Sequence, residues 1–547
     1  MSLPNVSGHR VLVVGGGIAG LASALELAIA GLDVTVVDRA ECLGGKLHQV
    51  NVNGTGIDGG PTVFTMRWIF DALFERAGTR LEEQLSIHRA EILARHAWSA
   101  NEQLDLYADR EQSAQAVESF SSKAEADRFL AFCDQAQRAY RTLEAAYIRS
   151  ERPSLMSMNR DLGLSGLKVL WDIGLFQSLS RSLSRYFKDP RLHQLFSRYA
   201  TYCGSSPMQA PATLMLIANV EMQGVWVIDG GMTALARCIQ RLAEQHGAKI
   251  RTQADCKNIV MADGRVCGIE LRDGEILTAD SVIFNGDVAA LRHGDVGIMD
   301  QRDRAPTKRH APSASAASGK PPSAVAQKAF GPPDVDLRQR SLSALTLAIH
   351  AKTTGFPLVH HNLFFNQNYA SEFQDIFQHH RLPQHPTVYV CAQDRHNGVG
   401  DSQPFGTERL LLLINAPATG DRRSFDSSEI EACTQAGFAL MARCGLTVDH
   451  HHKNTVITTP ASFHRRFPAT GGALYGQATH GWMSSFARHS SSSPIPGLYL
   501  AGGSVHPGPG VPMAAMSGRL AAATLMGHLG LIKPSGRVVI SGGTSTP

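Results

Sequence analysis

A glycine-rich turn near the N-terminus constrains the fold of this chain more than any other feature. Residues 11–17 read VLVVGGG, an apolar run that is typical of a strand buried on both faces of a parallel sheet. The Ala- and Leu-rich residues 18–30 predict a helix that ends at Gly31, and residues 32–38, LDVTVVD, predict a second strand. This order is one βαβ unit, so the sequence predicts an α/β fold with a Rossmann-like domain.

Gly15, Gly17 and Gly20 have G-x-G-x-x-G spacing between this strand and helix. In a dinucleotide-binding turn the first glycine allows the tight bend, the second lets backbone approach a pyrophosphate, and the third lets helix and strand pack closely. The pyrophosphate lies at the helix N-terminus, where unpaired N–H groups and the helix dipole attract an anion. Asp38 ends the second strand, where an acidic side chain binds ribose hydroxyls. The spacing alone is weak, but its strand–helix context predicts a dinucleotide site.

Two further glycine clusters follow the second strand, namely Gly44-Gly45-Lys46 and Asp58-Gly59-Gly60-Pro61-Thr62. Each cluster taken alone reads equally well as a simple turn. With them, the sequence resembles the flavin-dependent carotenoid desaturases related to phytoene desaturase and, more distantly, the amine oxidases. The resemblance implies that Gly44, Gly45 and Lys46 line the FAD pyrophosphate, and that Gly60, Pro61 and Thr62 approach the flavin. FAD, rather than NAD, is therefore the expected cofactor.

Residues 497–522, GLYLAGGSVHPGPGVPMAAMSGRLAA, resemble the C-terminal signature of the same family. In that signature a strand ends in glycines, here Gly502 and Gly503, which would lie against the cofactor. A helix then begins at Val511, Pro512 and Met513, with the proline fixing its first turn. Its positive end would stabilise the negative charge that a flavin gains on accepting hydride. The alternative is a glycine-rich turn before an ordinary helix.

The resemblance covers nearly the whole chain, except residues 304–327 and the C-terminal tail. Residues 340–377 are most similar to desaturases that act on 1-hydroxy or 1-methoxy carotenoids such as hydroxyneurosporene. Asp38 stands where relatives often have Glu, Cys256 replaces a valine that packs beside the adenine, and residues 487–490 lack the family's Arg-Pro pair. The last two departures leave the FAD contacts at those places open.

Glycine-rich signals at the start, middle and end of the chain predict a discontinuous FAD-binding domain with an inserted α+β domain that faces substrate and membrane. Residues 304–327 are almost entirely Ala, Pro, Ser, Lys and Arg, so they predict a flexible insertion. The expected FAD-binding parts are residues 1–85, 225–300 and 471–532, and the expected parts of the inserted domain are residues 86–224 and 330–470.

The resemblance implies an FAD-dependent desaturase that places a C-3,4 double bond in a 1-hydroxy or 1-methoxy carotenoid by hydride transfer, during carotenoid biosynthesis. Such a reaction needs orientation and a dry apolar tunnel more than acid–base side chains. His506 is the titratable side chain of the signature loop. It either accepts the proton or holds the loop by hydrogen bonds, and the second interpretation is favoured. The electron acceptor would be oxygen or a quinone.

Three other functions stay open: a phytoene-type desaturase, a carotenoid oxygenase or ketolase of the same fold, and, outside enzymes, a flavin- or lipid-binding module. No metal site is predicted, because His450 to Lys453 reads as a solvated loop and the nine cysteines lack C-x-x-C spacing. The formal charge of +4 is too small to suggest a nucleic-acid partner.

The sequence shows neither a secretory signal nor an apolar stretch long enough to span a bilayer, which predicts a cytoplasmic protein. Because carotenoids lie in the bilayer, we expect peripheral contact with the inner face of the membrane. Residues 164–188 mix Leu, Trp, Ile and Phe with Lys168, Arg181, Arg185 and Lys188, the composition of a basic interfacial helix. The alternative is an amphipathic helix packed on its own domain.

Overall fold

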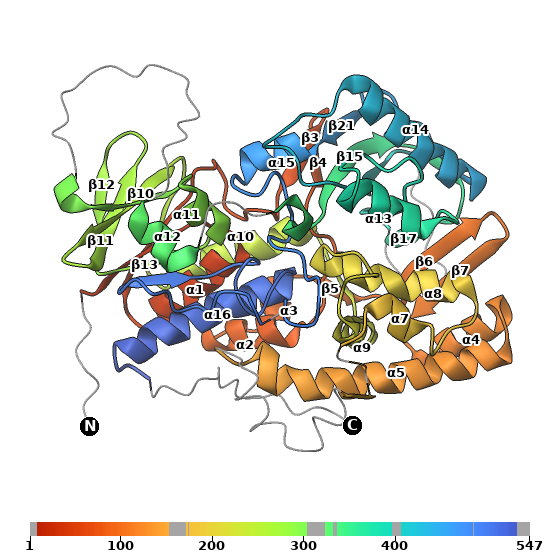
Figure 1. The fold of residues 1–547 in the computed structure, drawn as a ribbon, viewed down its shortest axis with the longest axis horizontal. Coiled ribbons are helices and arrows are strands. Elements are labelled where there is room, and N and C mark those ends of the chain that lie inside the picture. The colour runs from red at the N-terminus through yellow and green to blue at the C-terminus, as the bar shows by residue number, and fades with distance from the viewer. Residues whose placement is uncertain are drawn as a thin grey trace.

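The computed structural model describes residues 8–151, 171–172, 174, 176–303, 323–331, 336–395, 406–484 and 486–532. Two sheet-containing parts lie side by side, with the strands β10, β11 and β12 at one side of Figure 1 and the strands β6, β7, β15 and β17 at the other. The long helix α5 (Lys123–Leu143) runs beneath the second of these parts.

A five-stranded parallel sheet joins the start, middle and end of the chain. The predicted βαβ unit is present, with helix α1 (Ile18–Ile29) between its two strands. Val11 to Val14 are all buried, as expected for a central strand covered on both faces. The α/β, Rossmann-like fold is therefore confirmed. In spatial order the strands are β22 (Leu498–Leu500), β13 (Ser281–Phe284), β1 (Arg10–Val14), β2 (Asp33–Val37) and β9 (Lys249–Arg251).

Three helices pack around this sheet: α1, α10 (Met232–Gln245) and α16 (Val511–His528). The helix predicted after Gly503 is present as α16, and it lies beside α1 in Figure 1. The buried guanidinium of Arg519 donates to the Glu26 carboxylate at 2.8 Å and to the Ile69 carbonyl oxygen at 3.1 Å. This ion pair joins the first helix of the chain to the last one without leaving a buried charge unpaired.

A four-stranded sheet flanks the parallel sheet, and two short helices, α11 (Val288–His293) and α12 (Ala324–Phe330), lie beside it. Residues 304–322 of the predicted flexible insertion lie outside the described residues. For residues 323–327 the prediction is wrong, because Ser323 caps α12 and Ala326 is buried. In spatial order the strands are β12 (Ile276–Thr278), β11 (Arg265–Leu271), β10 (Cys256–Ala262) and β14 (Gly297–Asp300).

A seven-stranded mixed sheet forms the other part of the molecule, with helices α13 (Tyr369–Phe377) and α14 (Ser427–Arg443) beside it. Within the described part of this sheet, only the pairing of β17 with β6 is parallel. In spatial order the strands are β21 (Thr455–Thr458), β15 (Ser343–Ala351), β19 (Glu408–Ala416), β18 (Val388–Ala392), β17 (His361–Phe364), β6 (Ile92–Ser99) and β7 (Glu102–Tyr107).

The predicted helix over residues 164–188 falls partly outside the described residues. Within them, α7 spans only Leu179–Leu183, so a continuous helix as far as Lys188 is wrong. Ser178 caps the start of α7, and Asp189 caps the start of α8 (Pro190–Ser197), with the chain turning between them. Among the described helices, none combines the length and apolarity that crossing a membrane would need.

Shorter elements complete the described chain. They are β3 (Gln49–Val52), β4 (Thr55–Asp58), α2 (Trp68–Arg76), α3 (Leu81–Gln84), β5 (Ile87–Arg89), α4 (Arg110–Phe120), η1 (Glu144–Ile148), η2 (Arg198–Cys203), η3 (Ala212–Met215), α9 (Leu216–Gln223), β8 (Trp226–Ile228), η4 (Gln301–Asp303), η5 (Leu337–Gln339), β16 (Thr353–Gly355), β20 (Leu446–Val448) and α15 (Pro460–Arg466).

Candidate functional site

A cavity of about 1180 Å³ runs from the glycine-rich turn after β1 to the seven-stranded sheet. Gly20 does not line it. A Cβ at Gly20 would lie 2.0 Å from the Gly15 carbonyl oxygen, so this glycine allows α1 to pack on the turn. The cavity brings together all the other predicted FAD contacts: Gly15, Gly17, Asp38, Gly44, Gly45, Lys46, Gly60, Pro61, Thr62, Cys256, Gly502, Gly503, Val511, Pro512 and Met513.

The turn is held by hydrogen bonds that leave its glycines open toward the cavity. Gly15 has a φ of +101°, a conformation that favours glycine. The Asp38 carboxylate accepts from the Gly16 N–H at 2.7 Å and from the Ala40 N–H at 2.8 Å. Asn285, which the sequence did not single out, donates to the Gly15 carbonyl oxygen at 2.9 Å. Its position directly after the strand β13 is the sequence feature that could have identified Asn285 as a residue of this site.

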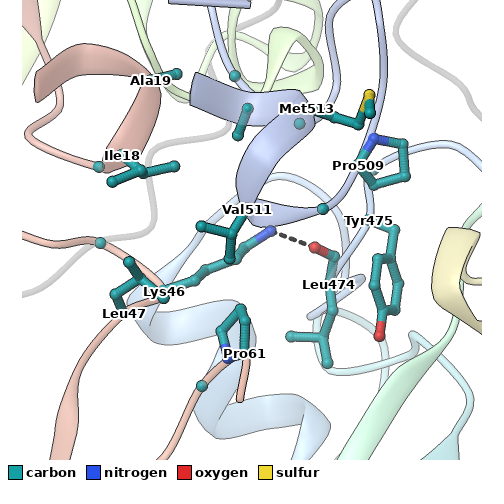
Figure 2. A pocket seen from close by; sticks show the side chains of 18 of the residues that line it. Ile18, Ala19, Lys46, Leu47, Pro61, Leu474, Tyr475, Pro509, Val511 and Met513 are labelled. Atoms are coloured by element: carbon teal, nitrogen blue, oxygen red, sulfur yellow. Dashed lines mark hydrogen bonds between the residues drawn. The ribbon is translucent and has the colours of Figure 1, made fainter. Parts of the chain in front are cut away.

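Lys46 is a buried cation in the wall of the cavity. Figure 2 shows its side chain extending toward the Leu474 carbonyl oxygen, which accepts its hydrogen bond, with Pro61 and Val511 close by. Burial lowers the pKa of the Lys46 ammonium group. A Cβ at Gly60 would lie 1.8 Å from the Lys46 carbonyl oxygen, so only glycine permits this close approach of two backbone segments. The arrangement places a positive charge beside the glycine clusters.

The glycine-rich segment before α16 forms part of the cavity wall. Gly502 has a φ of +121°, and its N–H donates to the Ser517 hydroxyl at 3.2 Å. Pro512 lies in the first turn of α16, and Val511 and Met513 lie at the cavity wall (Figure 2). Arg488, at the place where the Arg-Pro pair is missing, donates to the Gly503 carbonyl oxygen at 3.2 Å. It therefore supports the glycine turn directly.

His506 and Cys256 are both buried. The Nε2 of His506 lies 3.0 Å from the Tyr147 carbonyl oxygen, and burial lowers the pKa of its imidazole to about 4. This contact joins the signature loop to η1. Cys256 begins β10 and lines the cavity, and burial raises the pKa of its thiol to about 12. The thiol is therefore neutral and acts as a small apolar surface.

The far end of the cavity is walled mainly by apolar and aromatic side chains, but it holds two polar groups, of which the sequence singled out only Thr62. In one, the Glu221 carboxylate accepts from Arg198 at 3.2 Å and from Tyr199 at 2.8 Å. In the other, the Tyr389 hydroxyl lies 2.6 Å from the Thr62 hydroxyl and 2.7 Å from Nδ1 of His361. The apolar wall includes Ile217, Leu363, Leu411, Leu413, Trp482 and Phe486.

One histidine pair lies close to a cysteine. The donor atoms of His360, His361 and Cys391 lie within 4.8 Å of one another, and all three side chains are buried. The Sγ of Cys391 is 3.5 Å from Nε2 of His360, whose Nδ1 is 2.9 Å from the Arg395 carbonyl oxygen. The run at 450–453 is separate from this cluster: His450 stacks on Phe438 at 3.5 Å between ring centroids.

These residues fit FAD. The glycines that open the turn after β1 would accommodate the pyrophosphate, while Asp38 would bind the ribose. Lys46, which lies near Pro61 and Val511 in Figure 2, and the N-terminus of α16 place positive charge at the cavity wall. The remaining apolar space beyond Thr62 is left for a substrate.

Comparison with known proteins agrees with this geometry. Residues 18–526 match the family described as flavin containing amine oxidoreductase. The chain is 57% identical over 540 residues to a hydroxyneurosporene desaturase of Rubrivivax gelatinosus, covering 98% of this chain and 97% of that relative. It is 38% identical to one of Cereibacter sphaeroides, covering 95% and 98%. It is also 28% identical to a 4,4'-diapolycopene oxygenase of a Methylomonas species, covering 94% and 97%.

Solved structures show the same fold. An oxidoreductase from Methanosarcina mazei is 16% identical, with a TM-score of 0.57 and coverage of 93% of this chain and 99% of that one. A putrescine oxidase variant is 14% identical, with a TM-score of 0.57 and coverage of 95% and 99%. The chain therefore belongs to the flavin containing amine oxidoreductase family, in its carotenoid desaturase branch, and its cofactor is FAD.

Proposed function

We propose that this protein is a hydroxyneurosporene-type desaturase, which introduces a C-3,4 double bond into 1-hydroxy or 1-methoxy carotenoids. The carrying observation is the continuous cavity that joins the glycine-rich turn at Gly15 to an apolar chamber around Leu363 and Trp482. A polyene is a long apolar molecule, and such a chamber suits it. The 57% identity to a hydroxyneurosporene desaturase supports the same substrate class.

The side chains of the cavity orient and desolvate the substrate. FAD, when bound, supplies the hydride acceptor. The apolar wall excludes water and holds the reacting bond against Thr62 and Pro61, which is the main contribution that this reaction requires. The charge of Lys46 and the N-terminus of α16 favour the negative charge that accompanies hydride transfer. The conjugated chain of the substrate delocalises the positive charge left behind, and a proton then leaves the neighbouring carbon.

The proposed function is tested by supplying hydroxyneurosporene and neurosporene separately to the purified, FAD-loaded protein. We expect the hydroxylated carotenoid to gain one double bond at C-3,4. Desaturation of neurosporene alone would instead identify a phytoene-type desaturase. Incorporation of oxygen would identify an oxygenase, the activity named for the Methylomonas relative. A flavin spectrum without turnover of either carotenoid would identify a binding module.

We further propose peripheral contact with the inner face of the membrane by a cytoplasmic protein, through a surface that we call the aromatic patch: Trp171, Phe176, Met208, Trp482 and Met483. Trp171 is 73% exposed and Phe176 61% exposed. The Phe176 ring lies 5.0 Å from the Trp482 ring between centroids, and Trp482 lines the cavity. A carotenoid would thus pass from the bilayer into the cavity through an apolar entrance.

Cations border the aromatic patch. Arg181 and Arg185 are exposed and lie in or directly after α7, whose Leu179 and Ser180 N–H groups donate to the segment that carries Met208. Exposed aromatics beside cations are the composition of an interfacial surface. For the electron acceptor we propose oxygen or a quinone. Turnover under anaerobic conditions with an added quinone separates these two.

A further inference from the structure

His361 lies in the cavity wall with one ring nitrogen unused. It is on β17 and only 3% exposed. Its Nδ1 is 2.7 Å from the Tyr389 hydroxyl, which is 2.6 Å from the Thr62 hydroxyl. Its Nε2 has no hydrogen-bond partner among the described residues. A buried polar atom without a partner carries a free-energy penalty, so this nitrogen points to a ligand that completes it.

The ring of His361 is neutral. Burial lowers the pKa of its imidazole well below the usual value, and the neighbouring charges of His360 and Arg198 act in the same direction. A neutral imidazole carries one N–H donor and one acceptor nitrogen. We assign the hydrogen-bond direction as Thr62 to Tyr389 to Nδ1 of His361, which places the ring proton on Nε2. Nε2–H is then a buried, unpaired donor on a residue that lines the cavity.

The position of this donor suits the proposed substrate, and the inference rests on that proposed function. In a 1-hydroxy or 1-methoxy carotenoid, the oxygen-bearing carbon is only two carbons away from C-3. When the C-3,4 bond is placed for hydride transfer, the oxygen must therefore lie beside the flavin-facing loop. Thr62 belongs to that loop and begins the hydrogen-bonded chain that ends at His361.

We propose that Nε2 of His361 donates a hydrogen bond to the C-1 oxygen and thereby selects oxygenated carotenoid ends over hydrocarbon ends. A hydroxyl and a methoxy oxygen share only the ability to accept a hydrogen bond, so one donor recognises both. A hydrocarbon end would leave Nε2–H buried and unpaired. Sites built to hydrogen-bond a substrate reject the analogue that lacks the polar group for this reason.

A metal ion is the competing ligand of His361, because one donor atom each of His360, His361 and Cys391 lie within 4.8 Å of one another. The contact between Cys391 and His360 at 3.5 Å, and that between His360 and the Arg395 carbonyl oxygen at 2.9 Å, already use atoms of that group. A metal would have to break the first contact. We therefore favour the substrate oxygen and make bound metal an outcome of the test.

The test compares His361→Leu, His361→Gln and a control, His350→Leu, which changes a histidine outside the cavity lining. The measured quantity is kcat/KM for hydroxyneurosporene divided by kcat/KM for neurosporene. We expect His361→Leu to lower this ratio about ten-fold or more. His361→Gln should keep most of the ratio, because its amide N–H takes the place of Nε2–H. His350→Leu should leave the ratio unchanged.

A second readout measures binding without turnover. Both carotenoids are titrated into dithionite-reduced holoenzyme, which cannot accept hydride, and quenching of tryptophan fluorescence gives each Kd. His361→Leu should weaken binding of hydroxyneurosporene and leave that of neurosporene unchanged. If His361→Leu fails to load FAD, His361→Gln and Tyr389→Phe carry the test, and Tyr389→Phe should lower the ratio because the tautomer is no longer fixed.

Unchanged ratios in FAD-loaded His361→Leu would overturn the inference and leave the proposed function standing. Stoichiometric metal in the purified wild-type protein, lost in His361→Leu, would also overturn it in favour of a metal site. Failure of the wild type to desaturate hydroxyneurosporene would overturn the proposed function, and the inference with it.

Discussion

Gly518 of α16 lies directly against the carbonyl oxygen of Ala19 in α1, where a Cβ at position 518 would be 2.0 Å from that oxygen. The first and last helices thus approach as closely as backbone allows. Gly527 lies on the same helix α16, but a Cβ at position 527 would meet no atom of the described residues within 4 Å. The two glycines therefore make a matched pair for measuring what the close approach requires.

We expect Gly518→Ala to destabilise the protein by about 1–3 kcal/mol, because the added methyl group must push the helices apart. Gly527→Ala should stabilise it by roughly 0.5–1 kcal/mol, because alanine favours a helix over glycine. Thermal unfolding of both variants, with FAD content measured beside it, checks this. Equal effects of the two substitutions would show that the contact with Ala19 does not restrict residue 518.

Gly17→Val should abolish FAD binding while the protein still folds. Gly17 has φ −70° and ψ 175°, a conformation that valine adopts readily, and a Cβ there would meet only the Asn285 amide nitrogen, at 3.1 Å, among the described residues. The side chain would instead fill the space that a pyrophosphate needs. Flavin absorbance of the purified variant, compared with the melting curve of flavin-free wild type, measures both effects. A normal FAD content would contradict the assigned site.

His506→Gln should change how stability depends on pH. The pKa of His506 is about 4 in the folded protein, against an ordinary value of 6.5. Its contribution is therefore complete above pH 6.5 and is lost as the pH falls from 6.5 to 4, amounting to about 3 kcal/mol. Glutamine can still donate to the Tyr147 carbonyl oxygen, but it does not titrate. Denaturant melts from pH 4 to 8 should thus show a shallower acid-side loss in the variant, and parallel curves would refute this role.

Deletion of residues 306–320 should leave the melting temperature and activity nearly unchanged, because this Pro-, Ser- and Ala-rich sequence offers few large apolar side chains, and loop length affects closure entropy only slowly. Ser323→Ala should cost about 1 kcal/mol, because the Ser323 hydroxyl caps α12 and Phe330 of that helix is buried. Loss of folding on deletion would show that the connector makes contacts essential to the fold.

Replacing both Trp171 and Phe176 by serine should release the protein from anionic vesicles, because their exposed rings supply apolar area to the interface. Arg181→Glu with Arg185→Glu should weaken binding by about 1 kcal/mol for each charge lost, and more so at low salt. The control is Val456→Ser with Ile457→Ser, two exposed apolar residues of β21. Co-sedimentation with vesicles measures all three, and equal partitioning would place the lipid-facing surface elsewhere.

The parts of the fold that the sequence predicts well are those set by short-range patterns. The βαβ unit and α16 follow from an apolar run, a glycine turn and a proline, all within a few residues of one another. His361 and Tyr389 come together through the pairing of β17 with β18, in which Leu363 pairs with Tyr389, and Thr62 contacts Tyr389 from the loop after β4. No short-range sequence pattern predicts a contact between such distant segments, so the hydrogen bonds that link these three side chains could not be predicted from the sequence.

Two predictions are wrong because a capping residue begins a helix inside a segment whose composition indicates something else. Residues 323–327 look like the rest of their polar segment, but Ser323 begins a helix whose Phe330 is anchored in the core. Residues 178–188 look like part of a long interfacial helix, but Ser178 caps a short helix that ends at Leu183. In both cases one side-chain hydrogen bond to a backbone N–H outweighs the average character of the segment.

The five-stranded sheet has a consequence for how the protein is made. Because β22 and α16 are the last elements of the described chain to leave the ribosome, a nascent chain already carries the Gly15 turn but still lacks the walls from Gly502 to Met513. The wall of the FAD site is therefore complete only after residues 498–528 have been made. A prematurely terminated chain would be released empty, with α1 missing its helical neighbour, and would be open to proteolysis.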